Sequence, residues 1–294
     1  MRRASRSAFR ASLLILALAA AGAAPALAAD PPAAAPEAAP EAAPDAALQA
    51  ALAGDWRSEA NRARDAYRHP AQTLGFFGLA PGQTVVEITP GGGWYAEILA
   101  PYLRGSGQYV AAIVDPAAVP EGRGRDYQQR SKDGLEQRFA EAPARFDAAK
   151  IVGYDPAAPK FGDAGSADLV LTFRNVHNWR GSGQAEGMFK GFFDVLKPGG
   201  VLGVVEHRAK ADVPADDRSG YVGEAQVIAM AQAAGFVLDG KSEVNANPRD
   251  TKDHPNGVWT LPPGNNHEAA DAEKYRAIGE SDRMTLRFVK PARD

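Results

Sequence analysis

The sequence predicts an α/β protein whose core is a doubly wound, mainly parallel sheet of seven strands. From about residue 80 onward, short runs rich in β-branched residues alternate with stretches of helical periodicity. Such alternation requires crossover connections, and these place helices on both faces of the sheet. A glycine-rich turn also separates the first strand from the helix after it, which is where sheets of this class bind ligands.

Each element has its own signal in the sequence. The run DLVLTF reads as a buried strand, and Tyr95, Ile98, Leu99 and Tyr102 have the spacing of one helix face. The expected strands cover residues 84–88, 109–114, 150–154, 168–173, 201–206, 236–244 and 283–289. The expected helices cover residues 95–102, 125–146, 189–196 and 227–234, preceded by a polar helical stretch over 55–67 and a helix that begins at Pro70.

The first 28 residues have the three parts of a secretory signal peptide in the usual order. Four arginines precede an apolar run over residues 11–21, and Ala26-Leu27-Ala28 forms a small-x-small cleavage site. The apolar run is shorter than the roughly 20 residues that span a membrane. We therefore expect a periplasmic or secreted protein without a stable membrane anchor, exported by either the Sec or the twin-arginine route.

The rest of the chain divides into a linker and one domain. Residues 30–47 repeat a Pro-Glu-Ala-Ala theme without large apolar residues, which predicts a disordered Ala/Pro-rich linker over residues 29–51. Residues 52–294 form the domain, with its core over 70–290. The last two strands are separated by residues 245–282, a connection too long for a hairpin that we expect to form a functional flap.

Composition and charge exclude several functions. The chain has no cysteine, which excludes disulfides, thiol nucleophiles and thiolate metal sites. Without residues 1–28 it has 29 basic and 36 acidic residues, a formal charge of −7. A protein of that sign has no general attraction to nucleic acid, so we expect a small-molecule substrate; the oligomeric state is left open.

Two features at strand ends indicate a nucleoside ligand. The turn after the first strand contains Gly91, Gly92 and Gly93, which let the backbone approach a ligand and expose helix N–H groups to it. Asp115 ends the second strand, where a carboxylate can bind both hydroxyls of a ribose. The G-x-G-x-x-G spacing is absent, which argues against NAD and FAD.

The segments VVEITPGGGWYAEILA, VAAIVDP, ADLVLTFRNVHNW and FFDVLKPGGVLGVVEH occur in this order. In that order they resemble the motifs of class I S-adenosylmethionine-dependent methyltransferases over about 220 residues. The chain is also similar to a group of predicted bacterial methyltransferases with signal peptides that carry "RNVHNW", "DTKDHP" and "GESDRMTLRFVKP" segments. The resemblance implies a Rossmann-like sheet with an antiparallel last strand, S-adenosylmethionine as cofactor, and methyl transfer by direct displacement.

The resemblance also assigns residues to the cofactor site. Glu87 is the acid of the first motif, and Asp115 corresponds to the ribose-binding acid. Thr89 departs from the pattern, because it stands where the family usually has its first glycine. The implied cofactor-binding residues are Glu87, Thr89, Gly91, Gly93, Asp115, Tyr154 and Asp155.

Polar side chains after the fourth and fifth strands are candidates for the chemistry. His177 and His207 can accept a proton, because the ordinary pKa of histidine lies near neutrality. Arg174 can either form a structural salt bridge or hold a substrate. Candidate substrate residues are Asn175, Asn178 and Trp179 at the strand end, with Arg249 and His254 from the flap. Although His177, Glu206, His207 and Asp115 all lie at strand ends, no H-x-x-x-H or H-E-x-x-H spacing is present, so we expect no metal.

Three functions are compatible with these residues. The first is an exported methyltransferase that acts on a small molecule. The second is a non-catalytic protein that binds a ligand or partner on the same fold, which the Thr89-Pro90 departure favours. The third is a different enzyme, such as a hydrolase that uses the two histidines, although no G-x-S-x-G elbow supports a serine hydrolase.

Overall fold

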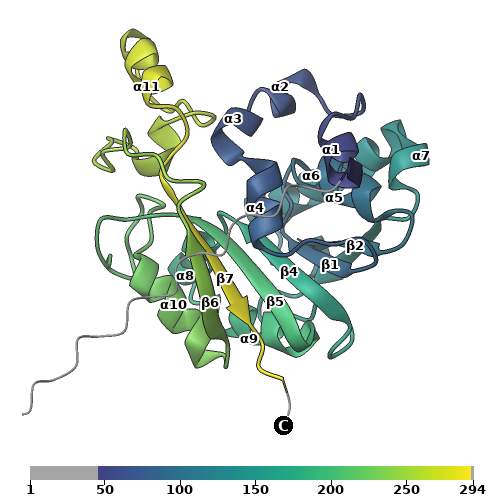
Figure 1. Ribbon diagram of the computed structural model, residues 1–294. Helices are drawn as coiled ribbons and strands as arrows, with labels where there is room; N and C mark the ends of the chain where they lie inside the picture. Colours follow the sequence, from purple (N-terminus) through teal and green to yellow (C-terminus); the bar gives the residue numbers. More distant parts are fainter. Residues whose placement is uncertain (1–45, 293–294) are drawn as a thin grey trace, which may run out of the picture. The chain divides into compact units, whose positions relative to one another are not determined.

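A computed structural model describes residues 46–292 of the chain (Figure 1). The expected signal peptide, residues 1–28, and most of the expected linker lie outside these described residues. Seven strands form one sheet in the order β3-β2-β1-β4-β5-β7-β6, in which β7 runs antiparallel to both of its neighbours. The other neighbouring pairs are parallel. The predicted fold class is therefore confirmed.

All seven expected strands are present, with small differences at their ends. β5 begins earlier than predicted, because the chain pairs with β4 from Leu196 and the Pro198-Gly199-Gly200 turn is absorbed into the strand. The strands are β1 (Thr84–Ile88), β2 (Gln108–Val114), β3 (Lys150–Tyr154), β4 (Ala167–Phe173), β5 (Leu196–His207), β6 (Val237–Ser242) and β7 (Arg283–Val289).

The helices differ more from expectation. Residues 46–51, expected in the linker, form part of a helix because Leu48 and Ala51 pack into the core. The expected helix over 125–146 is two helices, with Pro143 in the first turn of the second. The α-helices are α1 (Ala46–Leu52), α2 (Glu59–Arg62), α3 (Asp65–Arg68), α4 (Pro70–Phe76), α5 (Ala96–Leu103), α6 (Arg123–Glu141), α7 (Pro143–Phe146), α8 (Val176–Gly181), α9 (Ala185–Val195), α10 (Glu224–Ala233) and α11 (Ala272–Ile278).

Both faces of the sheet are buried under helices, as Figure 1 shows. One core cluster joins the sheet to α8, α9 and α10, with Phe189 and Phe192 of α9 at its centre. The other joins the opposite face to α1, α4, α5 and α6, with Ile98 and Leu99 of α5 fully buried. Burial of one such side chain contributes about 1.5–3 kcal/mol to the free energy of folding. Together the buried side chains of the two clusters hold β1, β4 and β5 in fixed register.

Three short 3₁₀ helices complete the described structure: η1 (Pro116–Ala118), η2 (Gly257–Thr260) and η3 (Ala269–Asp271). The segment expected to form a flap, residues 245–282, contains η2, η3 and α11 and joins β6 to β7. Over residues 46–292, no helix is both long enough and apolar enough to cross a membrane.

Candidate functional site

A cavity of about 530 Å³ lies at the carboxyl ends of β1, β4 and β5. Parallel strands end at the same edge of a sheet, so residues distant in sequence meet there. Thr89 follows β1, Arg174 follows β4, and His207 is the last residue of β5. The far wall comes from residues 245–282, which contribute Trp259 and Pro262 among others.

The glycine turn forms the floor of the cavity beside β1. A Cβ atom added at Gly91 or Gly92 would meet no atom within 4 Å, so the space above both residues is open. Gly91 has a φ of +58° and Gly93 a φ of +80°, conformations that favour glycine. At Gly93 a Cβ would lie 3.1 Å from the side chains of Arg138 and Leu135, so this glycine allows α6 to pack against the turn.

Thr89 has a conformation that is unusual for its residue type. Its φ is +52°, and a β-branched residue is disfavoured in this left-handed region. Its hydroxyl oxygen lies 2.9 Å from the hydroxyl oxygen of Tyr154, which is buried at the end of β3. Backbone conformations of this kind persist only where the surroundings impose them, and they concentrate at functional sites.

The residues implied for adenosine binding lie outside the cavity lining. Asp115 is half-buried at the end of β2, and its Oδ1 accepts a hydrogen bond from the Ala117 backbone N–H at 2.9 Å. Asp155 is exposed and accepts from the Ala157 N–H in the same way. Glu87, Thr89 and Gly91 do line the cavity, so it reaches only the β1 part of the expected cofactor site.

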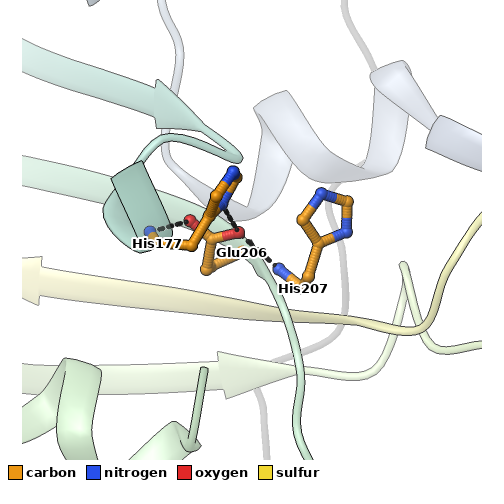
Figure 2. A group of neighbouring side chains, drawn as sticks. All are labelled: His177, Glu206 and His207. Atoms are coloured by element: carbon orange, nitrogen blue, oxygen red, sulfur yellow. Dashed lines mark hydrogen bonds and ion pairs between the residues drawn. The ribbon is translucent and has the colours of Figure 1, made fainter. Parts of the chain in front are cut away.

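Two histidines face the cavity side by side (Figure 2). Their ring centroids lie 5.4 Å apart. His177 Nδ1 lies 3.0 Å from Oε1 of Glu206, a fully buried residue, and His207 Nδ1 lies 2.5 Å from the Ser281 hydroxyl oxygen. Each ring is thus oriented through Nδ1, which leaves Nε2 for a ligand.

The two histidines have opposite pKa shifts. Burial lowers the pKa of His177, but the Glu206 carboxylate outweighs this effect and raises it above the ordinary 6.5. Burial lowers the pKa of His207 well below 6.5, and the positive charges of His177 and Arg174 lower it further. The site therefore contains a neutral imidazole beside one that readily holds a proton.

The side chains of His177, Glu206 and His207 also have the spacing of a metal site, with candidate ligand atoms within 4.8 Å of one another. However, Glu206 already accepts hydrogen bonds from the backbone N–H groups of His177 and His207 in addition to the imidazole. Arg174 also lines the same cavity and repels cations. This carboxylate therefore serves better to orient His177 than to bind a metal.

A group of arginines beside the histidines is the main feature that sequence reasoning did not predict. Arg64 and Arg68 come from the segment around α3, and both line the cavity with Arg174. All three lie around the carboxylate of Glu280. Burial opposes ionisation of Glu280, but the surrounding arginines lower its pKa to about 2. The sequence signals for this group were Arg174 after the fourth strand and the "GESDR" segment that contains Glu280.

The remaining candidates have different surroundings. Asn175 and Asn178 line the cavity, and Asn175 Nδ2 donates to the Ile88 carbonyl at 3.0 Å. Trp179 is buried against Phe192. Arg249 and His254 lie outside the cavity lining.

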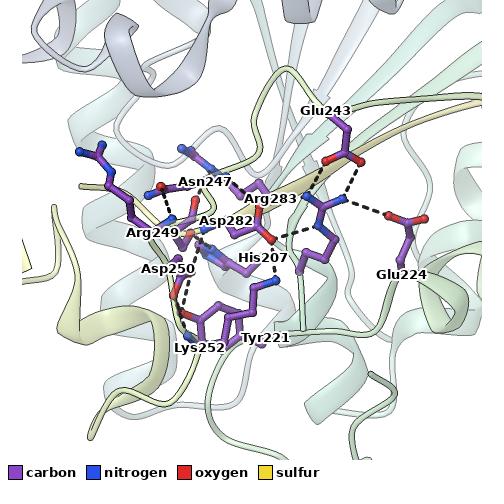
Figure 3. Close-up of polar contacts among 12 residues, drawn as sticks. His207, Tyr221, Glu224, Glu243, Asn247, Arg249, Asp250, Lys252, Asp282 and Arg283 are labelled. Atoms are coloured by element: carbon purple, nitrogen blue, oxygen red, sulfur yellow. Dashed lines mark hydrogen bonds and ion pairs between the residues drawn. The ribbon is translucent and has the colours of Figure 1, made fainter. Parts of the chain in front are cut away.

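His254 belongs instead to a polar cluster around Asp250 that anchors residues 245–282. Figure 3 shows Asp250 with Tyr221, Lys252 and Asp282 of this cluster. Asp250, itself buried, accepts hydrogen bonds from the Tyr221 hydroxyl, the His254 ring and the backbone N–H of Asp282. Asp282 in turn pairs with Lys252 at 2.6 Å. This cluster fixes the segment that forms the outer wall of the cavity.

Comparison with known proteins gives the fold class. The sequence matches no protein-family model, and it matches no curated protein. Among solved structures, the [4+2]-cyclase SpnF is similar at a TM-score of 0.55 and 16% identity, over 84% of this chain and 93% of that one. A SAM-dependent methyltransferase from Aquifex aeolicus is similar at a TM-score of 0.52 and 14% identity, over 78% and 93% of the two chains. The chain therefore has the Rossmann-like fold of class I methyltransferases.

The histidine assignments are open to a direct test by NMR. In the wild-type protein His177 is expected to titrate above pH 6.5 and His207 to remain neutral at that pH. Glu206→Gln removes the charge that favours protonated His177, so the pKa of His177 should fall. Because the folded-state pKa of His177 is raised, its pairing stabilises the protein below pH 6.5, and this contribution is lost as the pH rises through the folded value. A titration of His177 that is the same in both proteins would contradict the pairing.

The anchoring role of Asp250 predicts a loss of stability. Asp250→Ala leaves the partners of a buried carboxylate unsatisfied, so the free energy of unfolding should fall by about 3 kcal/mol. Urea denaturation followed by tryptophan fluorescence measures the change. The exposed Asp216 provides a matched control, because Asp216→Ala should change stability by about 0.5 kcal/mol or less. Equal effects of the two substitutions would refute the anchoring role.

Proposed function

We propose that this protein transfers a methyl group from S-adenosylmethionine to a small acceptor bound in the cavity. The observation that supports this most directly is the position of the cavity, which extends from the open space above Gly91 to the paired histidines. The fold and the motif order support the same conclusion. In sheets of this class, ligands bind at the carboxyl ends of the strands.

The residues present fit the cofactor in three respects. The space next to Gly91 and Gly92 is open, so a ligand can occupy the volume that a side chain would otherwise fill. Asp115 uses Oδ1 in its turn, and its Oδ2 accepts no hydrogen bond from the described part of the chain, so this oxygen is available to a ribose hydroxyl. Asp155 lies at the end of the neighbouring strand β3, where it can contact the adenine.

When bound, S-adenosylmethionine supplies a methyl group that is already activated by its sulfonium. The protein's contribution is then mainly to align the acceptor, and alignment of this kind lowers a barrier by roughly 7–11 kcal/mol. Asn178 orients the acceptor from α8, the helix that follows β4. His207 is neutral and can accept a proton from the acceptor, and His177, whose pKa is raised by Glu206, holds a proton more readily beside it.

The proposal includes export. The arginine-rich start, the apolar run and the small-x-small site at residues 26–28 support a cleaved signal peptide and a periplasmic or secreted location. A cytoplasmic location of the mature protein in fractionated cells would contradict this part of the proposal and leave the rest intact.

Calorimetric titration of the purified protein with S-adenosylmethionine and S-adenosylhomocysteine tests the cofactor. Both are expected to bind with submillimolar dissociation constants. Asp115→Asn keeps the oxygen that caps the turn but removes the charge, and should weaken binding by about tenfold or more, the value of one charged hydrogen bond. Asp163→Asn, at an exposed position, provides the control. Failure of the folded protein to bind either compound would contradict the proposal.

Thr89 supports a second candidate, a non-catalytic ligand-binding protein. Its side chain stands where the family has glycine and is held against Tyr154. If it excludes the cofactor, Thr89→Gly should create binding that the wild-type protein lacks, because glycine both removes the side chain and favours a φ of +52°. Tyr154→Phe removes only the hydrogen bond and serves as the comparison. Equal, tight binding by wild-type and Thr89→Gly proteins would show that Thr89 does not exclude the cofactor and would remove its support for this candidate.

A further inference from the structure

Three guanidinium groups line the cavity and share a single carboxylate. Arg64 Nε lies 2.7 Å from Glu280 Oε1, Arg68 Nε lies 3.3 Å from Oε2, and Arg174 Nη1 lies 3.9 Å from the same oxygen. A fourth, Arg283, lies 2.9 Å from Oε2 and is almost fully buried. Four positive charges therefore surround one negative charge at this end of the cavity.

Several donors in this group have no protein acceptor. The Arg174 guanidinium donates no hydrogen bond to residues 46–292, and its side chain is 25% exposed. Nη2 of Arg64 is buried and has no hydrogen-bond partner within the same described range. Arginine has five N–H donors in a planar fork, a shape that matches carboxylate and phosphate oxygens. The unused donors of Arg174 line the cavity, where a bound molecule can reach them.

Apart from Glu280, the acid in the cavity lining is Glu87, and it neutralises the arginines only in part. Glu87 lines the cavity, but burial raises its pKa to about 7, and it accepts a hydrogen bond from the Tyr109 hydroxyl. Burial together with the neighbouring charges lowers the pKa of Arg174 to about 10, so it remains positive at neutral pH. An uncompensated charge in a partly buried site is unfavourable unless a counterion binds.

We infer that the cavity binds a small organic anion through Arg174, with Arg64 and Arg68 completing the oxyanion site. Given the proposed function, on which this step rests, the methyl acceptor is a small molecule that carries a carboxylate or a phosphate. The methyl donor as a whole does not neutralise the arginines, because its sulfonium and ammonium outweigh its one carboxylate. Binding of the donor would add positive charge to the cavity, and an anionic acceptor would balance it.

The opposite wall suits the apolar part of such an acceptor. Residues 245–282 contribute Val258, Trp259, Pro262 and Pro263 to the lining. The indole of Trp259 is 43% exposed and meets the His177 ring edge-on, with centroids 6.0 Å apart. An anion with an apolar body can thus bind the arginines at one end and contact Trp259 beside the paired histidines.

Calorimetry with benzoate and with inorganic phosphate tests the site on the purified protein without any cofactor. Wild-type protein should bind at least one of the two anions, and Arg174→Asn should weaken that binding by about tenfold or more. Asparagine suits this test, because it tolerates the left-handed backbone at residue 174, where φ is +61°. Arg104→Gln removes an exposed arginine outside the cavity and should leave binding unchanged. Arg64→Gln, read with a thermal melt of each variant, provides a second test if Arg174→Asn does not fold.

A second experiment identifies whether the acceptor or the methyl donor contacts the arginines. Benzoate or phosphate should still bind to protein saturated with S-adenosylhomocysteine, and Arg174→Asn should not change the affinity for S-adenosylhomocysteine. The inference is wrong if S-adenosylhomocysteine displaces the anion and if Arg174→Asn weakens the binding of S-adenosylhomocysteine but not that of 5′-methylthioadenosine, which lacks the carboxylate. In that case the arginines hold the donor's carboxylate.

The two proposals fail separately. No binding of either anion at millimolar concentrations, by protein that binds S-adenosylhomocysteine, would overturn the anion site alone. Binding of an anion by protein that binds no S-adenosylhomocysteine would support the anion site and contradict methyl transfer.

Discussion

One carboxylate connects the three segments that enclose the cavity. Glu280 contacts Arg64 and Arg68 from the segment around α3, Arg174 from the end of β4, and Arg283 at the start of β7. These contacts join the outer wall and the amino-terminal helices to the sheet edge. They also keep the arginines together, since groups of like charge would otherwise repel one another. The positions of Arg64, Arg68 and Arg174 in the cavity depend on this arrangement.

Most of the fold could be predicted because the sheet is buried on both faces. Buried strands appear in a sequence as short apolar runs, and β1, β2, β4 and β7 lie within one residue of their predicted bounds. The short helices could not be predicted in the same way. α8 has only six residues, and its two buried apolar residues, Val176 and Trp179, are too few to mark a helix face in the sequence. α1 was missed because Leu48 and Ala51 are too few to mark a helix face.

The candidate site was predictable where topology alone brings residues together. His177 and His207 follow neighbouring parallel strands, so their proximity follows from strand order. The arginines around α3 are different, because their place over the cavity depends on how an irregular amino-terminal segment packs. No periodicity in the sequence encodes that packing. The contact between Thr89 and Tyr154 is likewise a matter of side-chain conformation, which the glycine-rich motif does not reveal.

The reversed direction of β7 has a consequence for how such a site can diversify. Because β7 is antiparallel, its first residues lie beside the last residues of β5, and Arg283 pairs with His207. The long connection that precedes β7 is therefore delivered to the mouth of the cavity, opposite the glycine turn. Changes in its length or composition alter which molecule is admitted without disturbing the half of the site beside β1. Under the proposed function, acceptor selectivity from residues 245–282 and donor recognition beside β1 are encoded in separate stretches of the gene and can evolve independently.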